Sequence, residues 1–295
     1  MADSQLIKLD SANPSVLLKR DSENEYILSI KDNVIVREPL NITFNNTLKD
    51  LNINLIIKIG KNVKATIIER FENKKDQTIM FHSRIFADKD SDLRFIIFQN
   101  LSNGSKLTDI CEIEVKKSAK VHFINFQLGG KDIRSTLQQV SLNEYGSLNT
   151  DLLCRTHNNQ NHHFDISNTY KSMNGYGRII AKGIALDKGQ LMINGAITIT
   201  NKGGGTDAHL RQDSLLLSKN ASLRTTPKLN IATNDVKAGH GASVTNLNDE
   251  SLFYLATRGI SEKDVKKMLI NGFVAEQLDK ISDLPELRNE IYQII

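Results

Sequence analysis

The chain has 295 residues and a mass of 33.1 kDa, with 38 basic and 34 acidic residues and a formal net charge of +4. Lys and Arg are scattered among Asp and Glu without a dense basic block, so the composition does not favour a nucleic-acid-binding protein. The apolar runs are only strand-sized, and the first residues lack the basic start and apolar core of a secretory signal, so we expect a cytoplasmic protein.

The pattern along the chain predicts three segments. Residues 1–33 are expected to form a short N-terminal extension, and residues 34–246 read as short β-type runs separated by polar turns. Phe95-Ile96-Ile97-Phe98 is one such run. Only Pro39 and Pro227 fall in the second segment, which suits a continuous hydrogen-bonded sheet.

A short motif recurs in the β-rich segment: a polar turn, a small residue and then an alternating strand. Its third position falls at residues 63, 91, 119 and 146, in steps of 28, 28 and 27, and further copies are centred at 189 and 221. Repetition at this period without helical periodicity predicts a mainly β fold, a parallel β-helix or solenoid of stacked coils. An antiparallel sandwich with evenly spaced hairpins is the alternative.

Residues 247–295 are predicted to form two to three short helices. The first would begin near Asn248 and end at Gly259 in the left-handed conformation, and Ser261 would cap the second, with Asp264 three residues later. The third would begin near Ser282. The apolar stripes expected on the second and third helices are Val265, Met268, Leu269, Phe273 and Val274, and then Leu287 and Ile291. Such helices would cap the open end of a solenoid.

Motifs for enzymatic chemistry are scarce in this sequence. It has no Walker-type phosphate loop, no G-x-S-x-G elbow and no H-E-x-x-H pair, and we expect a non-catalytic protein. Cys111 and Cys154 form no CxxC pair and are expected to be packed, reduced thiols. His157, His162 and His163 could share a metal if their loop folded back, although the surrounding Asn and Gln residues suit a solvated turn.

His240 stands apart from the other histidines because it lies between Gly239 and Gly241, where the backbone can approach a ligand or another chain closely. Several blocks around it, taken together and in order, resemble the core of the SufB/SufD family of iron–sulfur cluster assembly scaffolds. The residue sequence of the block that contains His240 is similar to that of SufD-type chains. The blocks are residues 167–171, 193–195, 206–208, 213–218, 226–231, 235–242 and 253–260.

This resemblance implies a right-handed parallel β-helix that pairs through its coils with a SufB-like subunit or with a second copy of itself. It also implies that an ABC-type ATPase, SufC, docks on the C-terminal helices and that its ATP-driven movement reshapes the subunit interface. The ATPase activity would then belong to the partner. The candidate docking residues are Phe253, Arg258, Ile260, Met268 and Phe273.

The chain departs from the family pattern where a cluster would be held. The cluster-forming cysteine of SufB-type chains falls at Gln212, and the glutamate that follows the histidine in SufB is Gly241 here. SufD-type chains often carry a cysteine where this chain has Ala238. Because iron–sulfur clusters are held mainly by thiolates, we expect no permanently bound cluster on this chain alone. His240 would either give one imidazole to a transient cluster shared with a partner's thiolate and carboxylate, or order the interface by hydrogen bonding.

Two other classes remain open at this point. A carbohydrate-active β-solenoid enzyme would need acidic groups clustered on one sheet face, but Asp151, Asp165 and Asp187 show no spacing that demands this. A purely structural solenoid would explain the repeat and leave the His240 region and the helical tail without a role.

Overall fold

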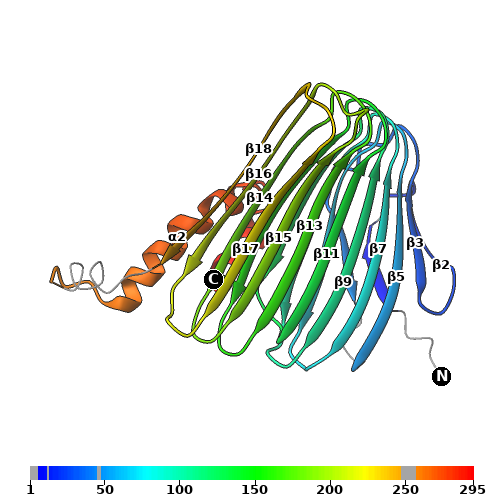
Figure 1. The fold of residues 1–295 in the computed structure, drawn as a ribbon. Helices are drawn as coiled ribbons and strands as arrows, with labels where there is room; N and C mark the ends of the chain where they lie inside the picture. Colours follow the sequence, from blue (N-terminus) through cyan, green and yellow to red (C-terminus); the bar gives the residue numbers. More distant parts are fainter. Residues whose placement is uncertain (1–5, 12, 45–47, 247–256) are drawn as a thin grey trace.

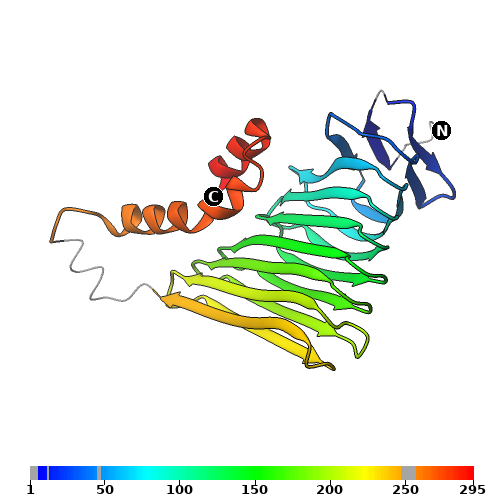
Figure 2. The same cartoon turned by 90° about the horizontal axis from the view of Figure 1, so that it is seen from above.

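The protein is mainly β, and most of the chain forms a parallel solenoid of two facing sheets (Figures 1 and 2). The computed structural model describes residues 6–11, 13–44, 48–246 and 257–295. Among the described residues each sheet has nine strands, and from β3 onward successive strands of the chain alternate between the two sheets. We name the sheets A and B.

Strand bounds follow the spatial order within each sheet. Sheet A contains β1 (Ile7–Asp10), β4 (Leu40–Phe44), β6 (Lys64–Asn73), β8 (Asp92–Leu101), β10 (Lys120–Gln127), β12 (Ser147–Thr156), β14 (Tyr176–Ala185), β16 (Thr206–Leu216) and β18 (Val236–Asn246). Sheet B contains β17 (Ser222–Ile231), β15 (Gln190–Ile199), β13 (Asn161–Tyr170), β11 (Asp132–Ser141), β9 (Lys106–Val115), β7 (Thr78–Ala87), β5 (Asp50–Ile59), β3 (Glu25–Ile30) and β2 (Val16–Arg20).

The strand register confirms the predicted solenoid and rules out the antiparallel sandwich. All strand pairs from β3 and β4 onward are parallel, and only β1–β4 and β2–β3 are antiparallel. In sheet A, each coil advances by 27 to 31 residues, as the chain of paired positions shows: Lys64, Asp92, Lys120, Ser147, Tyr176, Asp207 and Lys237.

The turns of the solenoid form two rows: the first row leads into the strands of sheet A, and the second leads into those of sheet B. The first four copies of the sequence motif lie in the first row and the last two in the second. The first four copies lead into β6, β8, β10 and β12 of sheet A, whereas the copies centred at 189 and 221 lead into β15 and β17 of sheet B. Each coil has two turns, so a polar turn followed by a strand occurs twice per coil. The long step between 146 and 189 is therefore a change of row.

One residue in the left-handed conformation lies in each turn of the first row except the last, which joins β17 to β18. Asn and Asp tolerate this conformation better than most residues because their short side chains hydrogen-bond locally. Tyr145 is the least expected residue type at such a position. The residues with positive φ in this row are Asn33, Asn62, Asp90, Ser118, Tyr145, Asn174 and Gly205.

Residues 7–30, which the sequence assigned to an extension, add strands to both sheets at the N-terminal end. Tyr26 and Leu28 on β3 are fully buried in the main core, and Ile30 follows them with the same alternation. A period-two pattern of this kind is the mark of a half-buried strand. The described part of this segment therefore packs as the first coil of the stack.

The C-terminal segment forms α2 (Glu262–Asp279) and α3 (Pro285–Ile294). The predicted cap of α2 is confirmed, because the Ser261 hydroxyl accepts a hydrogen bond from the Asp264 N–H at 3.2 Å. Gly259 has the predicted positive φ of 78°. The helix expected before Gly259 lies outside the described residues. Neither α2 nor α3, the helices of the described chain, is long and apolar enough to span a membrane.

The helices lie against the outer face of sheet A, so the expectation that they cap the open end is wrong (Figure 2). The physical reason is an apolar strip that crosses the outer face of this sheet. The strip and the helices form a second hydrophobic cluster. Its buried members are Ile68, Ile96, Phe98, Ile124, Phe126, Leu128, Leu153, Ile184, Leu215 and Leu217 from the sheet side and Ile270, Val274, Leu278, Ile281, Leu287 and Ile291 from the tail.

Charged contacts fix the position of the tail along this strip. Arg94 forms a two-pronged contact with Asp283 at 2.8 and 2.7 Å. Farther along the sheet, Lys182 Nζ lies 2.9 Å from Glu276 and donates to the Phe273 carbonyl at 2.8 Å. Paired guanidinium and carboxylate groups add geometric specificity to the apolar contact.

The predicted stripe of α2 is only partly correct. Val265 and Val274 are buried as expected, but Met268 is 64% exposed and Leu269 is 36% exposed. Ile270 and Leu278 take their place against the sheet. The predicted stripe of α3 is confirmed, since its buried residues are Leu287 and Ile291.

Candidate functional site

His240 lies on β18, the last strand of sheet A, at the C-terminal end of the stack (Figure 1). It pairs in register with Leu210 of β16, whose side chain is buried in the interior. Paired residues of neighbouring strands point to the same face of a sheet. His240 therefore points to the inner side of the sheet, and it is exposed because no further coil of the described chain covers it.

His240 lies beside the C-terminal end of the hydrophobic core, where apolar side chains are only partly covered. Leu223 and Leu229 of β17 and Ala238 of β18 pack against the core but remain partly exposed. Val244, on the same side of β18 as His240, is 45% exposed. Half-covered apolar side chains beside an exposed imidazole mark a surface that another polypeptide can complete.

The two edge strands differ in their free backbone groups. In β17 the amide N–H of Ser222 donates to the Gly189 carbonyl of the preceding turn. The backbone N–H groups of even-numbered residues in β17 therefore point toward the sheet, and those of odd-numbered residues point to the free edge. Pro227 occupies one of these free-edge positions and removes a donor there. An interrupted row of donors makes the edge of β17 a poorer template for strand addition.

The edge of β18 has no such interruption. Tyr176 and Asp207 pair with each other on neighbouring strands of sheet A, and the amide of each donates to the preceding coil. Lys237 of β18 pairs with Asp207 in turn, so the amides of odd-numbered residues in β18 point toward the sheet. The amides of even-numbered residues, among them His240 and Ala242, therefore point to the free edge. The site thus combines an exposed imidazole with an uninterrupted row of amides that no strand of the described residues pairs with.

Gln212, the other predicted interface residue, lies on β16, one coil inside the edge. Its side chain is fully buried, and its Oε1 accepts a hydrogen bond from the Thr225 hydroxyl at 2.7 Å. Its Nε2 has no hydrogen-bond partner among the described residues. Because Gln212 pairs in register with Ala242, it lies beneath β18, two positions along from the Leu210–His240 pair.

The glycines that flank His240 have different surroundings. A Cβ at Gly239 would lie 3.0 Å from His209 Nδ1 on the neighbouring strand, whereas nothing lies within 4 Å of one at Gly241. Gly239 therefore makes room for the His209 ring on the outer face. Gly241 leaves the outer face open next to the edge.

The five predicted docking residues do not share one surface. Phe253 lies outside the described residues. Arg258 is exposed in the turn before α2, Ile260 is half-buried, and Met268 is exposed on the solvent side of α2. Phe273 instead packs on sheet A, with the Lys182 ammonium 5.0 Å from its ring centroid. Leu269 was not predicted for docking, although it is exposed beside Met268.

The three clustered histidines point in different directions. His162 is buried in the interior, where its Nε2 lies 3.0 Å from the Gly130 carbonyl and burial lowers its pKa to about 4. His163 points to the outer face of sheet B, and His157 lies in the preceding turn beside Asn158. Adjacent strand residues face opposite sides of a sheet, which the spacing alone did not reveal. Within the described residues, no group of His, Cys, Asp and Glu is arranged to hold a metal ion.

The three aspartates weighed for a carbohydrate-active site are also separated. Asp151 lies on sheet A, where it contacts His122 Nε2 at 2.7 Å, and Asp165 lies on the outer face of sheet B. Asp187 lies in a turn with a positive φ of 54°. They do not form a pair of facing carboxylates of the kind that glycoside hydrolysis uses.

Comparison with known proteins identifies related sequences. Residues 43–273 match the family model described as SUF system FeS cluster assembly, SufBD core domain. The chain is 28% identical over 234 residues to the iron–sulfur cluster assembly protein SufD of Escherichia coli, covering 77% of this chain and 54% of that protein. It is 25% identical over 285 residues to a SufBD family protein of Synechocystis, covering 91% of this chain and 62% of the relative.

A SufBD family protein of Staphylococcus saprophyticus is 24% identical over 190 residues, or 64% of this chain and 41% of its own length. The chain thus spans roughly half the length of the curated relatives it matches. The family match covers most of the solenoid and reaches into α2. The chain therefore belongs to the SufB/SufD family of SUF-system iron–sulfur cluster assembly proteins.

Proposed function

We propose that this chain is a SufD-like, non-catalytic scaffold subunit that works in the cytoplasm. In this proposal it pairs with a second β-solenoid subunit at the β17–β18 end, and an iron–sulfur cluster assembles transiently between them as cargo. The observation that carries the proposal is the position of His240. It is an exposed imidazole on the inner side of an edge strand whose amides are free to pair.

The nature of the partner follows from the cysteines of this chain. Cys111 and Cys154 are both buried in the core, and burial raises the pKa of each thiol. They remain protonated at neutral pH and lie away from the open end, so neither supplies a thiolate there. Clusters are held mainly by thiolates. The proposed partner is therefore a cysteine-bearing, SufB-like subunit, since a second copy of this chain would add imidazole and no accessible thiol.

The proposed role of the tail is to connect an ABC-type ATPase to the scaffold. The exposed side of α2, with Met268 and Leu269, is available to such a partner, while the opposite side is held on sheet A. Arg211, on β16 next to the edge strand, contacts Glu276 of α2 at 2.6 Å. A displacement of α2 would act on the strand that pairs with β18, close to His240.

Replacing His240 with alanine tests the ligand role. We expect cluster formation in the reconstituted complex to fall by at least about tenfold, because the cluster loses one of its proposed ligands. The side chain is exposed, so folding and subunit pairing should persist. The readout is the rate of cluster absorbance growth under anaerobic conditions, with pairing checked by gel filtration.

His209→Ala is the matched control, because His209 is exposed on the neighbouring strand but faces outward. It should assemble clusters at the wild-type rate. Undiminished assembly in His240→Ala would remove the ligand role. Rescue by His240→Gln, which keeps a hydrogen-bonding group, would assign His240 to ordering the interface instead.

A further inference from the structure

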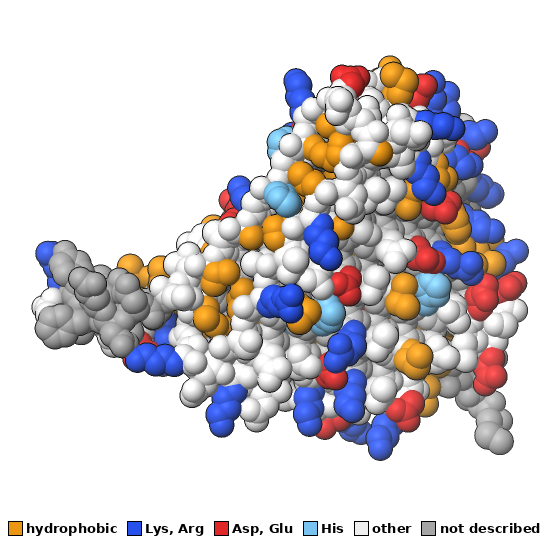
Figure 3. Space-filling view, in the orientation of Figure 1, with side chains coloured by type: hydrophobic (Ala, Val, Ile, Leu, Met, Phe, Trp, Pro, Cys, Tyr) orange, Lys and Arg blue, Asp and Glu red, His pale blue; other side chains and the backbone are white. Residues whose placement is uncertain are grey.

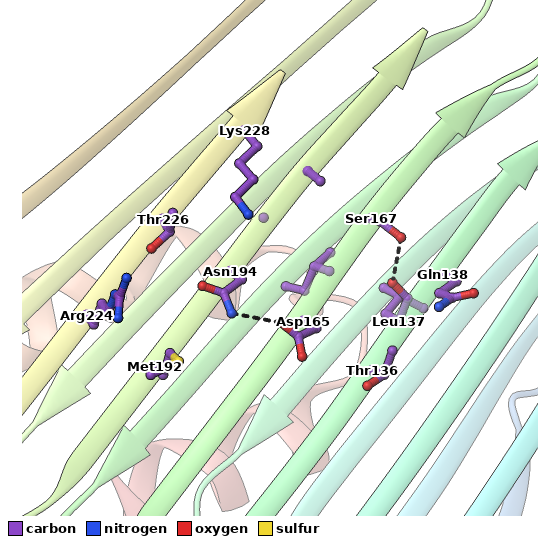
Figure 4. A pocket seen from close by; sticks show the side chains of 13 residues that line it. Thr136, Leu137, Gln138, Asp165, Ser167, Met192, Asn194, Arg224, Thr226 and Lys228 are labelled. Carbon is purple, nitrogen blue, oxygen red and sulfur yellow. Dashed lines mark hydrogen bonds between the residues drawn. The ribbon is translucent and has the colours of Figure 1, made fainter. Parts of the chain in front are cut away.

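The outer face of sheet B contains a groove that opens away from His240, although one side of it is formed by β17 at the same end of the stack. It has a volume of about 410 Å³ and crosses β11, β13, β15 and β17 (Figure 4). Neither α2 nor α3 covers this face, which Figure 3 shows open to solvent. Strand register explains the depression, because the small side chain of Ala196 lies between Ser167 and Lys228 in one row across the sheet.

Two cations stand on the β17 side of the groove. Arg224 and Lys228 are both exposed, and among the described residues neither forms an ion pair. Elsewhere on the surface many cations are paired, as Arg134 is with Asp132 at 3.7 Å. Arg224 and Lys228 are four residues apart, so their Cα atoms are separated by about 13 Å. In Figure 4 the Lys228 ammonium extends toward Asn194 and Thr226, which lie between the two cations.

The groove contains one acidic group, and neighbouring side chains engage it. Asn194 Nδ2 donates to Asp165 Oδ1 at 2.8 Å, and His163 Nε2 lies 3.3 Å from the same oxygen. Asp165 is on β13, whereas Arg224 and Lys228 are on β17, two strands away. The β17 side of the groove is therefore positively charged, and the Thr226 hydroxyl lies between the two cations.

We propose that this groove binds a small molecule with two acidic groups, one held by Arg224 and the other by Lys228. A guanidinium forms paired hydrogen bonds with a carboxylate or a phosphate, and an ammonium acts as a point charge for either. The Thr226 hydroxyl and the Asn194 amide supply neutral polar contacts between them. The volume is within the range of small-molecule sites. The proposal does not rest on the assembly role, because the groove opens on the outer face of sheet B, whereas His240 points to the inner side of sheet A and the tail lies on the outer face of sheet A.

Isothermal titration of the full chain with inorganic pyrophosphate, succinate and inorganic phosphate tests this at about 0.15 M salt. We expect saturable binding of pyrophosphate, of succinate or of both, and weaker binding of phosphate, which has a single acidic group. Arg224→Gln and Lys228→Gln should each weaken binding of the two-group ligand by about tenfold, and the double variant should abolish saturable binding. Arg134→Gln, on the same face but outside the groove lining, is the matched control and should bind as wild type.

Each outcome decides between the proposal and its rejection. Preference for pyrophosphate would identify a phosphate-bearing ligand, and preference for succinate a dicarboxylate. Absence of saturable binding for both pyrophosphate and succinate at millimolar concentration would overturn the proposal. So would equal affinity in the double variant, or phosphate that binds as tightly as the ligands with two acidic groups. Circular dichroism of the variants confirms that the exposed substitutions leave the fold intact.

Discussion

Replacing Asp109 with asparagine is expected to raise the free energy of unfolding at pH 7.5 by about 3 kcal/mol and to change it far less at pH 4. Asp109 lies on β9, buried in the interior, and burial raises its pKa from 3.8 to about 7. The Ser135 hydroxyl donates to its Oδ2 at 3.0 Å, and an asparagine oxygen can accept the same bond. The variant therefore removes a buried ionisable group and keeps its shape.

The direction of the effect follows from linkage. The unfolded carboxyl ionises near pH 3.8 and the native one near pH 7, so the stability that Asp109 contributes is lost as the pH rises between these values. Glu69 adds to the effect, since burial and then the nearby Asp109 raise its pKa, and both its oxygens lack partners among the described residues. Without the Asp109 charge, Glu69 ionises at a lower cost.

His162 acts in the opposite direction over the same range. Its native pKa of about 4 lies below its ordinary value of 6.5, so its contribution is lost as the pH falls through this window. The wild-type profile therefore contains two opposed slopes, and the difference between variant and wild type isolates Asp109. Urea unfolding at pH 4 and pH 7.5 measures this difference in the free energy of unfolding between Asp109→Asn and wild type. Asp50→Asn, at an exposed strand start, is the control. An equal difference at both pH values for Asp109→Asn would contradict the account.

Replacing Val274 with aspartate is expected to release the tail from sheet A. Val274 is fully buried between α2 and the apolar strip, so a carboxylate there would be desolvated among apolar side chains. Burial of an unpaired charge costs several kcal/mol, more than the surface ion pairs at Asp283 and Glu276 can offset. Hydrogen exchange should show loss of protection over residues 262–294 while the strands of both sheets stay protected.

The matched control is Met268→Asp on the solvent side of the same helix. Met268 is 64% exposed, so the tail should stay docked and protected. If Met268 contributes to ATPase docking as proposed, this variant should lose ATPase binding with the tail still in place. A Val274→Asp tail that remains protected would show that the polar contacts, rather than the apolar strip, hold it.

The fold could be predicted from the sequence because one period dominates it. Repeating turns at steps of 28, 28 and 27 residues specify stacked coils, and the register of sheet A confirms this spacing. The placement of the tail was missed, although a signal for it was present. Ile96 and Phe98 break the alternation in Phe95-Ile96-Ile97-Phe98, and a strand with apolar residues on both sides is covered on both faces.

The candidate site could be predicted less completely. The prediction that His240 lies near an interface came from a resemblance of sequence blocks, and its exposure on the inner side of an edge strand required the register. His162 and His163 are neighbours on β13, so they separate because residues 161–170 form a strand rather than the loop that the sequence suggested. Distances between coils are invisible in a sequence, so the groove on sheet B could not be anticipated. The groove depends on rows of residues about 30 positions apart, such as Ser167, Ala196 and Lys228.

The central claim is that a second subunit completes the His240 site by pairing with the edge of β18. Light scattering after gel filtration of this chain mixed with a cysteine-bearing SufB-like subunit tests it most directly. The account predicts a heterodimer for wild type. It predicts a loss of pairing for Ala242→Pro, which removes an amide facing the free edge, and for Val244→Glu, which charges an exposed apolar contact. A wild-type mixture that stays monomeric, or two folded variants that pair as well as wild type, would contradict it.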